Sequence, residues 1–188
     1  MARELPKLED LASSKTLALK PDYLQAMGWF QSAWAGIEIN TDFAICKFLH
    51  VTHEQGHLIT SGQMFGRKAR LLADLIARSD HPKKQNILTA FNKVRGGTLR
   101  DVFAHGYVAS DKDSVTFIER PAGGDFRAEQ HCFTLQEFVA HVAKIAQAGM
   151  DFNDVLEDAL EMDNEELDAF ANAALSLKLK PTTPPGSA

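Results

Sequence analysis

Apolar residues recur every three or four positions through most of this chain, which is the spacing of amphipathic helices. The longest such pattern begins at Pro21, and proline is well suited to the first position of a helix. Its apolar positions are Tyr23, Met27, Phe30, Trp34, Ile37, Thr41, Ala44 and Phe48. Further patterns predict a short helix or loop over residues 53–62, a helix over about residues 64–79 and another over residues 83–105.

Residues 107–133 lose this spacing and read as a small β-rich insertion. Short β-like runs at residues 107–109, 114–118 and 126–129 predict a hairpin or a three-stranded flap. Thr134 and Glu137 then form the two ends of a capping box, which predicts the start of another helix. The apolar positions of that helix are Phe138, Val142, Ile145, Gly149, Phe152 and Leu156.

The two ends of the chain add less regular segments. We expect a short helix over about residues 8–18 and a last helix that ends near Leu177. Residues 179–188, which are rich in proline, read as a disordered tail. The expected fold class is therefore all-α: an up-down antiparallel helical bundle in a single domain over residues 1–178, with the β-rich insertion after the third helix.

Two glycine positions carry specific expectations. Gly96 and Gly97 stand inside the predicted third helix, where each costs about 1 kcal/mol relative to alanine. They indicate either a break in the helix or the close approach of a second chain. Gly106 follows the end of that helix, where we expect it to adopt the left-handed conformation.

The composition limits the classes of protein to consider. Apolar residues make up 45% of the chain and charged residues 24%, as in ordinary soluble domains. We find no apolar run that could span a membrane and no signal peptide at the N-terminus. Cys46 and Cys132 do not form a disulfide framework, so we expect two reduced thiols in a cytoplasmic protein.

Charge is unevenly distributed along the chain, whose net charge is −5. Residues 67–100 carry nine basic and two acidic residues, whereas residues 102–180 carry fifteen acidic and six basic ones. Such a basic block suits a polyanionic partner, although a charge-rich pair of helices can also be an ordinary solvated surface.

The basic block ends in the sequence Arg100-Asp101-Val102-Phe103-Ala104-His105. Asp101 and His105 are four residues apart, so on a helix they share a face and the carboxylate can orient the imidazole. Arg100 and His105 are five residues apart, about 140° around the helix axis. They would meet only if the helix ends there or if the arginine faces the histidine of another chain.

This Arg-x4-His pattern, read here as RDVFAHG, resembles the signature of HEPN domains, small helical domains common in bacterial toxin–antitoxin and defence systems. The sequence from Met64 to Leu75 is similar to a helix that often precedes the motif, and Ala35-Gly36-Ile37-Glu38 resembles the middle of the first long helix. The resemblance covers roughly residues 20–110. Asp101 departs from it, since asparagine often follows the arginine in this family.

The resemblance implies a metal-independent endoribonuclease without a cofactor. Arg100 would bind the scissile phosphate, His105 would move a proton at the ribose 2′-hydroxyl or the leaving oxygen, and Asp101 would orient His105. Candidate substrate-binding residues are Lys93, Arg95, Tyr107 and Glu38. The implied partners are RNA, a second copy of the chain with which a cleft is shared, and an antitoxin or other regulatory protein.

Two alternatives remain open. The domain can be a catalytically silent HEPN-like module that binds a protein or nucleic acid. It can also be a small zinc hydrolase, because His53-Glu54-Gln55-Gly56-His57 fits the H-E-x-x-H pattern of two zinc ligands and a general base. Gly56 within that segment and the lack of a clear third ligand count against the zinc site.

Overall fold

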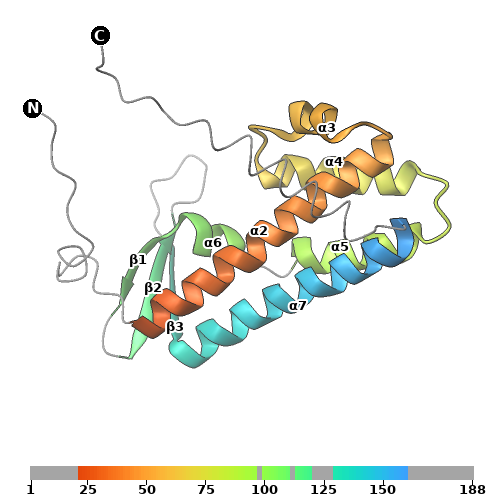
Figure 1. The fold of residues 1–188 in the computed structure, drawn as a ribbon. Coiled ribbons are helices and arrows are strands. Elements are labelled where there is room, and N and C mark those ends of the chain that lie inside the picture. The colour runs from red at the N-terminus through yellow and green to blue at the C-terminus, as the bar shows by residue number, and fades with distance from the viewer. Residues whose placement is uncertain (1–20, 97–98, 111–112, 120–128, 161–188) are drawn as a thin grey trace, which may run out of the picture. The chain divides into compact units, whose positions relative to one another are not determined.

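The computed structural model describes residues 21–96, 99–110, 113–119 and 129–160, whose fold is shown in Figure 1. This part of the chain is mostly helical and contains one small antiparallel sheet, as the sequence pattern predicted. The predicted helix over residues 8–18, the last helix near Leu177 and the tail at residues 179–188 lie outside the described residues.

The helices within this part are α2 (Pro21–Leu49), α3 (His53–Thr60), α4 (Phe65–Arg78), α5 (Lys84–Gly96), α6 (Arg100–His105) and α7 (Leu135–Leu160). The predicted start of α2 at Pro21 is confirmed. The predicted capping box of α7 is also present, because the Thr134 hydroxyl accepts a hydrogen bond from the Glu137 amide while the Glu137 carboxylate accepts one from the Thr134 amide.

The prediction of one continuous helix over residues 83–105 is wrong. Helix α5 ends at Gly96, and the separate six-residue helix α6 begins at Arg100. Gly97 lies outside the described residues, but the weak helix propensity of Gly96 explains why the chain leaves the helix at this point. Of the two interpretations of the glycine pair, a break in the helix is the one observed.

The β-rich insertion contains three strands in the order β1-β2-β3, with both pairs antiparallel. They are β1 (Tyr107–Ser110), β2 (Ser114–Glu119) and β3 (Glu129–Thr134). Tyr107 pairs with Ile118, and Ser114 pairs with Thr134. The third strand was predicted at residues 126–129, of which 126–128 lie outside the described residues; β3 is described from Glu129 and continues past the predicted end to Thr134.

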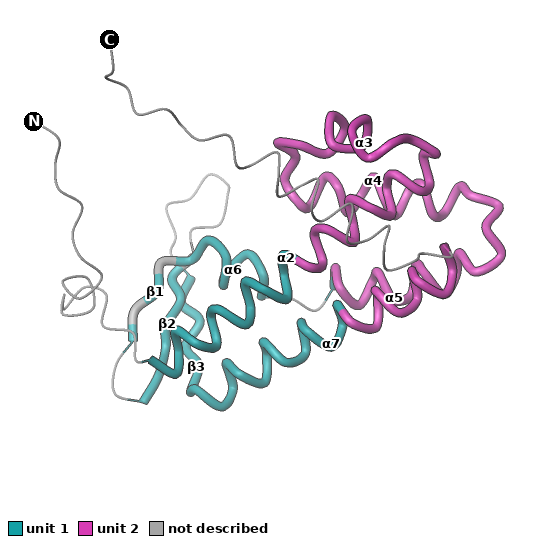
Figure 2. Tube along the Cα trace, viewed as in Figure 1, with its two compact units in different colours: residues 1–35, 96–149 teal, residues 36–95, 150–188 magenta. Residues whose placement is uncertain are grey.

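The chain divides into two compact units, which Figure 2 shows in different colours. Unit 1 consists of residues 1–35 and 96–149, and unit 2 of residues 36–95 and 150–188. Each unit is thus assembled from two stretches of the sequence. Unit 1 holds α6, the sheet and the adjoining parts of α2 and α7, whereas unit 2 holds α3, α4, α5 and the remaining parts of those two helices.

Aromatic side chains form the centre of unit 1. The Phe103 ring of α6 lies 5.5 Å from Phe30 of α2, 4.9 Å from Phe117 of β2 and 5.0 Å from Phe138 of α7, measured between ring centroids. All four side chains are buried. Burial of such large rings dominates the stability of a small core, so α6 is fixed to the unit through Phe103.

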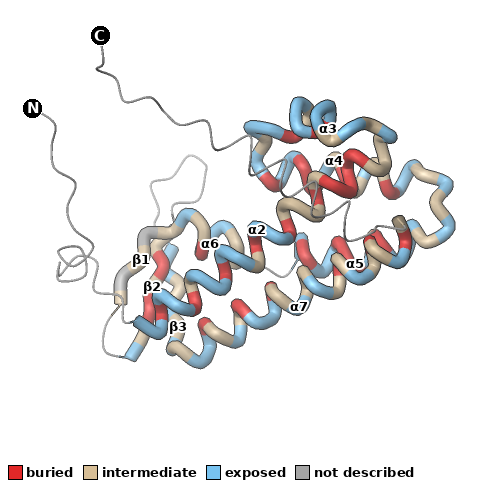
Figure 3. Tube along the Cα trace, viewed as in Figure 1, coloured by how far each residue is buried: buried red, intermediate tan, exposed pale blue. Residues whose placement is uncertain are grey.

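Unit 2 has a mixed aliphatic and aromatic core. Phe91 of α5 packs against Phe152 of α7, with the ring centroids 5.1 Å apart. Buried residues recur at helical spacing along the elements of this unit, and Figure 3 colours them red along the trace. No helix within the described residues is long and apolar enough to cross a membrane.

Candidate functional site

Arg100, the first residue of α6, is held close to the body of unit 1. Its side chain is only 15% exposed, and its guanidinium carbon lies 5.0 Å from the centre of the Trp34 ring on α2. An aromatic face attracts a guanidinium through its quadrupole and also removes it from water. Trp34 was predicted only as a core residue, yet it also positions the arginine of the motif.

The carboxylate of Asp101 forms an ion pair with Arg100. Arg100 Nη1 donates a hydrogen bond to Asp101 Oδ1, and the Asp101 side chain is 69% exposed. One partner of this pair is therefore held by the fold while the other faces solvent. Because oxygens of a carboxylate and of a phosphate suit the same donors, Asp101 occupies the position that a phosphate would take on the guanidinium.

His105 is the last residue of α6 and its side chain is exposed. Within the described residues, its imidazole takes part in no hydrogen bond, ion pair or ring contact, with Asp101 or with any other group. The spacing predicted that Asp101 would orient His105; in the structure the Asp101 carboxylate turns to Arg100 instead. The arrangement leaves His105 accessible to a substrate.

Gly106 ends α6 in an unexpected way. The prediction that it adopts the left-handed conformation is wrong, because its φ is −67° and its ψ is 140°. Its backbone is extended and leads directly into β1. The glycine is required for space: a Cβ atom at this position would lie 2.4 Å from the carbonyl oxygen of Val102 and 3.4 Å from Phe117.

The four predicted substrate-binding residues lie in different surroundings. Lys93 of α5 is exposed and forms an ion pair with Asp151 at 3.4 Å, and the Arg95 guanidinium lies 5.9 Å from the centre of the Phe91 ring. The backbone of Tyr107 belongs to β1, but its side chain lies outside the described residues. Glu38 is partly buried on α2. Within the described residues of unit 1, the structure brings Arg100, Asp101 and Trp34 together.

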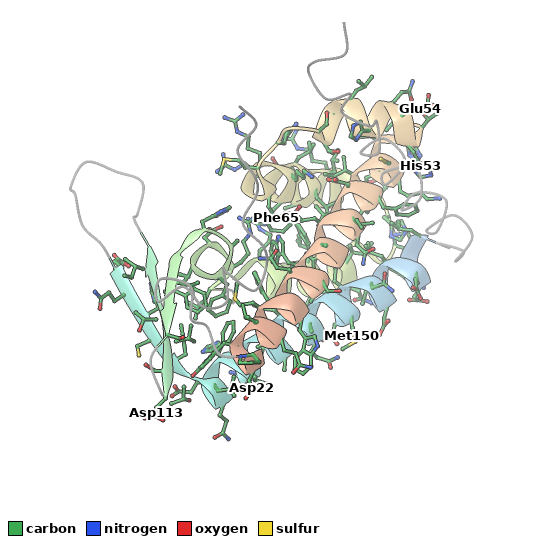
Figure 4. All side chains as sticks on the ribbon, turned by 60° about the vertical axis from the view of Figure 1, so that its left-hand side comes forward. Asp22, His53, Glu54, Phe65, Asp113 and Met150 are labelled. Atoms are coloured by element: carbon green, nitrogen blue, oxygen red, sulfur yellow. The ribbon has the colours of Figure 1, made fainter. Side chains whose placement is uncertain are left out.

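The H-E-x-x-H segment forms the short helix α3, from which His53 and Glu54 project as shown in Figure 4. Gly56 faces inward, and a Cβ atom there would lie 2.0 Å from the Cys46 sulfur. The His53 ring stacks on Phe43 with the centroids 5.8 Å apart, while His57 is exposed. Packing against α2 thus explains why Gly56 and His53 occupy the two inward positions of the segment.

Within the described residues, no group of three or more histidine, cysteine, aspartate or glutamate side chains is arranged to hold a metal ion. The two histidines of α3 consequently lack a third ligand of these types in that part of the chain. Zinc sites in hydrolases need three protein ligands in addition to the reacting water.

A largely buried ion pair, which the sequence analysis did not predict, also lies in unit 2. Lys68 of α4 donates a hydrogen bond of 2.8 Å to Asp42 Oδ2 of α2, and the two side chains are 10% and 21% exposed. Burial raises the pKa of the Asp42 carboxyl, although its hydrogen bond to Lys68 and the charge of that lysine act to lower it. Burial, followed by the charge of Asp42, likewise raises the pKa of the Cys46 thiol.

The two ion pairs can support different chemistry. The Arg100 guanidinium could exchange the exposed Asp101 for a phosphate, with an accessible imidazole at the other end of the same short helix. The Lys68–Asp42 pair is closed to such exchange, since both partners are largely buried. No protein-family model, curated protein or solved structure matches the chain.

Proposed function

We propose that the protein is a HEPN-type endoribonuclease that cleaves RNA without a metal ion. The observation that carries this proposal is the state of Arg100, a cation that the fold holds against Trp34 while the carboxylate of Asp101, with which it forms an ion pair, faces solvent. Such a guanidinium is ready to receive a phosphate diester at little reorganisation cost. The resemblance of the RDVFAHG sequence to the HEPN motif supports the same assignment, together with an up-down bundle of that type.

In the proposed reaction, the ribose 2′-hydroxyl attacks the adjacent phosphorus and the bond from phosphorus to the 5′-oxygen breaks. The products are a 2′,3′-cyclic phosphate and a free 5′-hydroxyl, and the proton lost by the attacking hydroxyl is balanced by the proton gained by the leaving oxygen. Arg100 binds the phosphate oxygens, where negative charge develops. His105 accepts or delivers one of these two protons, since an imidazole can do either near neutral pH.

The test is cleavage of RNA by purified protein in excess EDTA. We expect wild type to cleave, and Arg100→Ala and His105→Ala to lose cleavage. His53→Ala serves as the control in the competing H-E-x-x-H segment and should cleave as wild type does. Cleavage that stops on chelation, or that survives both motif substitutions, would remove the proposed mechanism.

The exposed carboxylate beside Arg100 favours a second candidate, a catalytically silent module that binds RNA or a protein. Asp101 places negative charge next to the proposed phosphate site and holds the guanidinium that the substrate needs. Binding of RNA by the wild type without any cleavage product, under conditions in which the protein is folded, would select this candidate over the ribonuclease.

We further propose that the working form is a homodimer, which an antitoxin or another regulatory protein then controls. Residues 23–37 of α2 include no charged side chain, although many of them face solvent. Leu24 and Trp29 are both 54% exposed there. Interfaces are poor in charge and rich in tryptophan, so this surface suits a second copy that carries the same uncharged face.

The dimer is tested by sedimentation of wild type and of Trp29→Glu. The substitution should shift the protein to a monomer, since it places a charge in the centre of the contact. Leu58→Glu is the matched control, because Leu58 is 80% exposed on α3 and should tolerate a charge without dissociation. A wild type that sediments as a monomer at the concentration of the cleavage assay would exclude the dimer.

A further inference from the structure

Three arginines lie on the solvent face of α4, on the side opposite its buried residues. Arg67, Arg70 and Arg78 are exposed, whereas Phe65, Leu72 and Ile76 are buried. The intervals between positions 67, 70, 74 and 78 are three, four and four residues, so these side chains follow one face of the helix. The single acidic residue on this face is Asp74, which is exposed.

Within the part of unit 2 that the structure describes, these arginines differ from the lysines in that their side chains have no polar or aromatic partner. Within the described residues, Arg67, Arg70 and Arg78 form no ion pair and no side-chain hydrogen bond. The lysines of this unit are engaged: Lys68 with Asp42, Lys83 with Asp158, Lys93 with Asp151, Lys84 with the carbonyl oxygen of Ser79, and Lys47 with the Phe43 ring.

The α4 face has the chemistry of a phosphate-binding surface. Each guanidinium offers a planar fork of donors that matches two phosphate oxygens. From Arg67 to Arg78 the helix rises about 17 Å, which equals several nucleotides at the 3.4 Å rise of a stacked strand. The first turn of α4 contains no acidic residue that would repel a polyanion.

We propose that the exposed face of α4, formed by Arg67, Arg70 and Arg78, binds the phosphate backbone of a single-stranded nucleic acid. The inference rests on the proposed function only for the identity of the strand as RNA. The surface shares no residue with the Arg100–His105 motif, and it contributes affinity without base recognition. Asp74 weakens the contact, because it places one negative charge among the three positive ones.

The experiment measures binding of a fluorescent 20-nucleotide RNA by anisotropy, and binding of a DNA strand of the same sequence in a parallel arm. All proteins carry His105→Ala, so that cleavage does not consume the RNA. The test variant combines Arg67→Gln, Arg70→Gln and Arg78→Gln. The matched control combines Lys47→Gln, Lys83→Gln and Lys84→Gln, which changes the net charge equally at engaged lysines.

We expect the arginine variant to bind RNA at least 10-fold more weakly at low salt. The negative slope of log K against log salt should become less steep by about 2, which is near 0.7 for each lost phosphate contact. The lysine variant should change affinity less than threefold. Asp74→Asn should strengthen binding. Circular dichroism and thermal unfolding check that the variants remain folded.

Equal losses in the arginine and lysine variants would overturn the assignment of this face, because net charge alone would explain them. Failure of the His105→Ala protein to bind either strand at low salt would also overturn it and favour an acidic protein as the partner. Tight binding of DNA as well as RNA supports the backbone surface but not the restriction to RNA. If the wild type binds RNA through these arginines but does not cleave it, the proposed binding surface on α4 stands and the proposed ribonuclease activity is excluded.

Discussion

Two of the ion pairs in this protein, Lys68–Asp42 and Arg100–Asp101, differ in how far the aspartate is exposed to solvent. Lys68 and Asp42 are 10% and 21% exposed, so both charges have lost most of their hydration. Arg100 is 15% exposed, but its partner Asp101 is 69% exposed. A buried pair resists the loss of either partner, because the other is left charged without solvent. The pair with an exposed carboxylate can open at small cost, so that another anion can take the place of Asp101 on the guanidinium.

The two motif-bearing helices differ in the same respect. In α3, the segment His53–Thr60, the inward positions are explained by packing, with Gly56 against the Cys46 sulfur and His53 against the Phe43 ring. In α6, packing explains Phe103 and the position of Arg100 but gives no contact to His105 within the described residues. Chemistry-bearing side chains without a packing role are the better candidates for function.

The largest expected effect is on cleavage by Arg100→Met. We expect the rate to fall at least 100-fold, since one donor to the developing charge is typically worth 10²–10³ in rate. Unfolding in urea should change by less than about 1 kcal/mol, because Asp101 is exposed and is not left as a buried charge. A loss of stability equal to that of a buried pair would show that Arg100 is a structural residue.

Lys68→Met should give the opposite result, with normal cleavage and a free energy of unfolding about 3 kcal/mol lower at neutral pH. Without the lysine, the pKa of Asp42 rises further above its ordinary value, since burial is already its main cause. An acid with a raised pKa in the folded state costs stability as pH rises from the unfolded pKa to the folded one. The urea midpoint of the variant should therefore lie close to that of wild type at acidic pH and fall below it at neutral pH.

Gly56→Ala tests whether packing fixes α3. The new Cβ atom would lie 2.0 Å from the Cys46 sulfur, so we expect a loss of about 2 kcal/mol from overpacking. Combining it with Cys46→Ala should recover part of this loss, which thermal unfolding of the single and double variants measures as a coupling energy. Strict additivity of the two substitutions would mean that the contact does not constrain the helix.

Asp101→Asn should have the smallest effect, but the direction of the change in RNA affinity or cleavage rate distinguishes two roles of the carboxylate. If the carboxylate competes with phosphate for Arg100, its removal should raise RNA affinity about fivefold, near 1 kcal/mol for an exposed ion pair. If Asp101 instead orients His105, as the sequence spacing predicted, the same variant should cleave more slowly. Single-turnover cleavage and binding to an inactive His105→Ala background separate these outcomes.

Periodicity alone predicted the long elements well. The apolar stripe of α2 contains Tyr23, Phe30 and Trp34, all of which are buried, and the α7 positions Phe138 and Phe152 are fully buried. These positions follow from local spacing and from one strong cap at Thr134. The β-rich insertion was predicted in the right place, but its third strand continues to Thr134, past the predicted end at residue 129, because short strands carry little periodic signal.

What sequence could not supply were contacts between distant residues. Gly56 contacts Cys46 only after α3 packs on α2. At position 106 a glycine is required because a Cβ atom would clash with the carbonyl oxygen of Val102, and not because the backbone is left-handed. The position of Lys68 in the sequence is informative, since this lysine lies on the same face of α4 as the apolar residues Phe65 and Leu72. A lysine on an apolar stripe indicates a buried partner, but the identity of Asp42 required the structure.

Each compact unit contains one cysteine, in opposite environments. Cys46 in unit 2 is buried, and its raised thiol pKa further reduces the reactive thiolate, whereas Cys132 of β3 in unit 1 is exposed. An alkylating reagent should therefore modify Cys132 at once and reach Cys46 only when the surrounding structure opens. The modification rate of Cys46 in native buffer then reports the opening equilibrium of unit 2, with Cys132 in the same molecule as a reference for reagent reactivity.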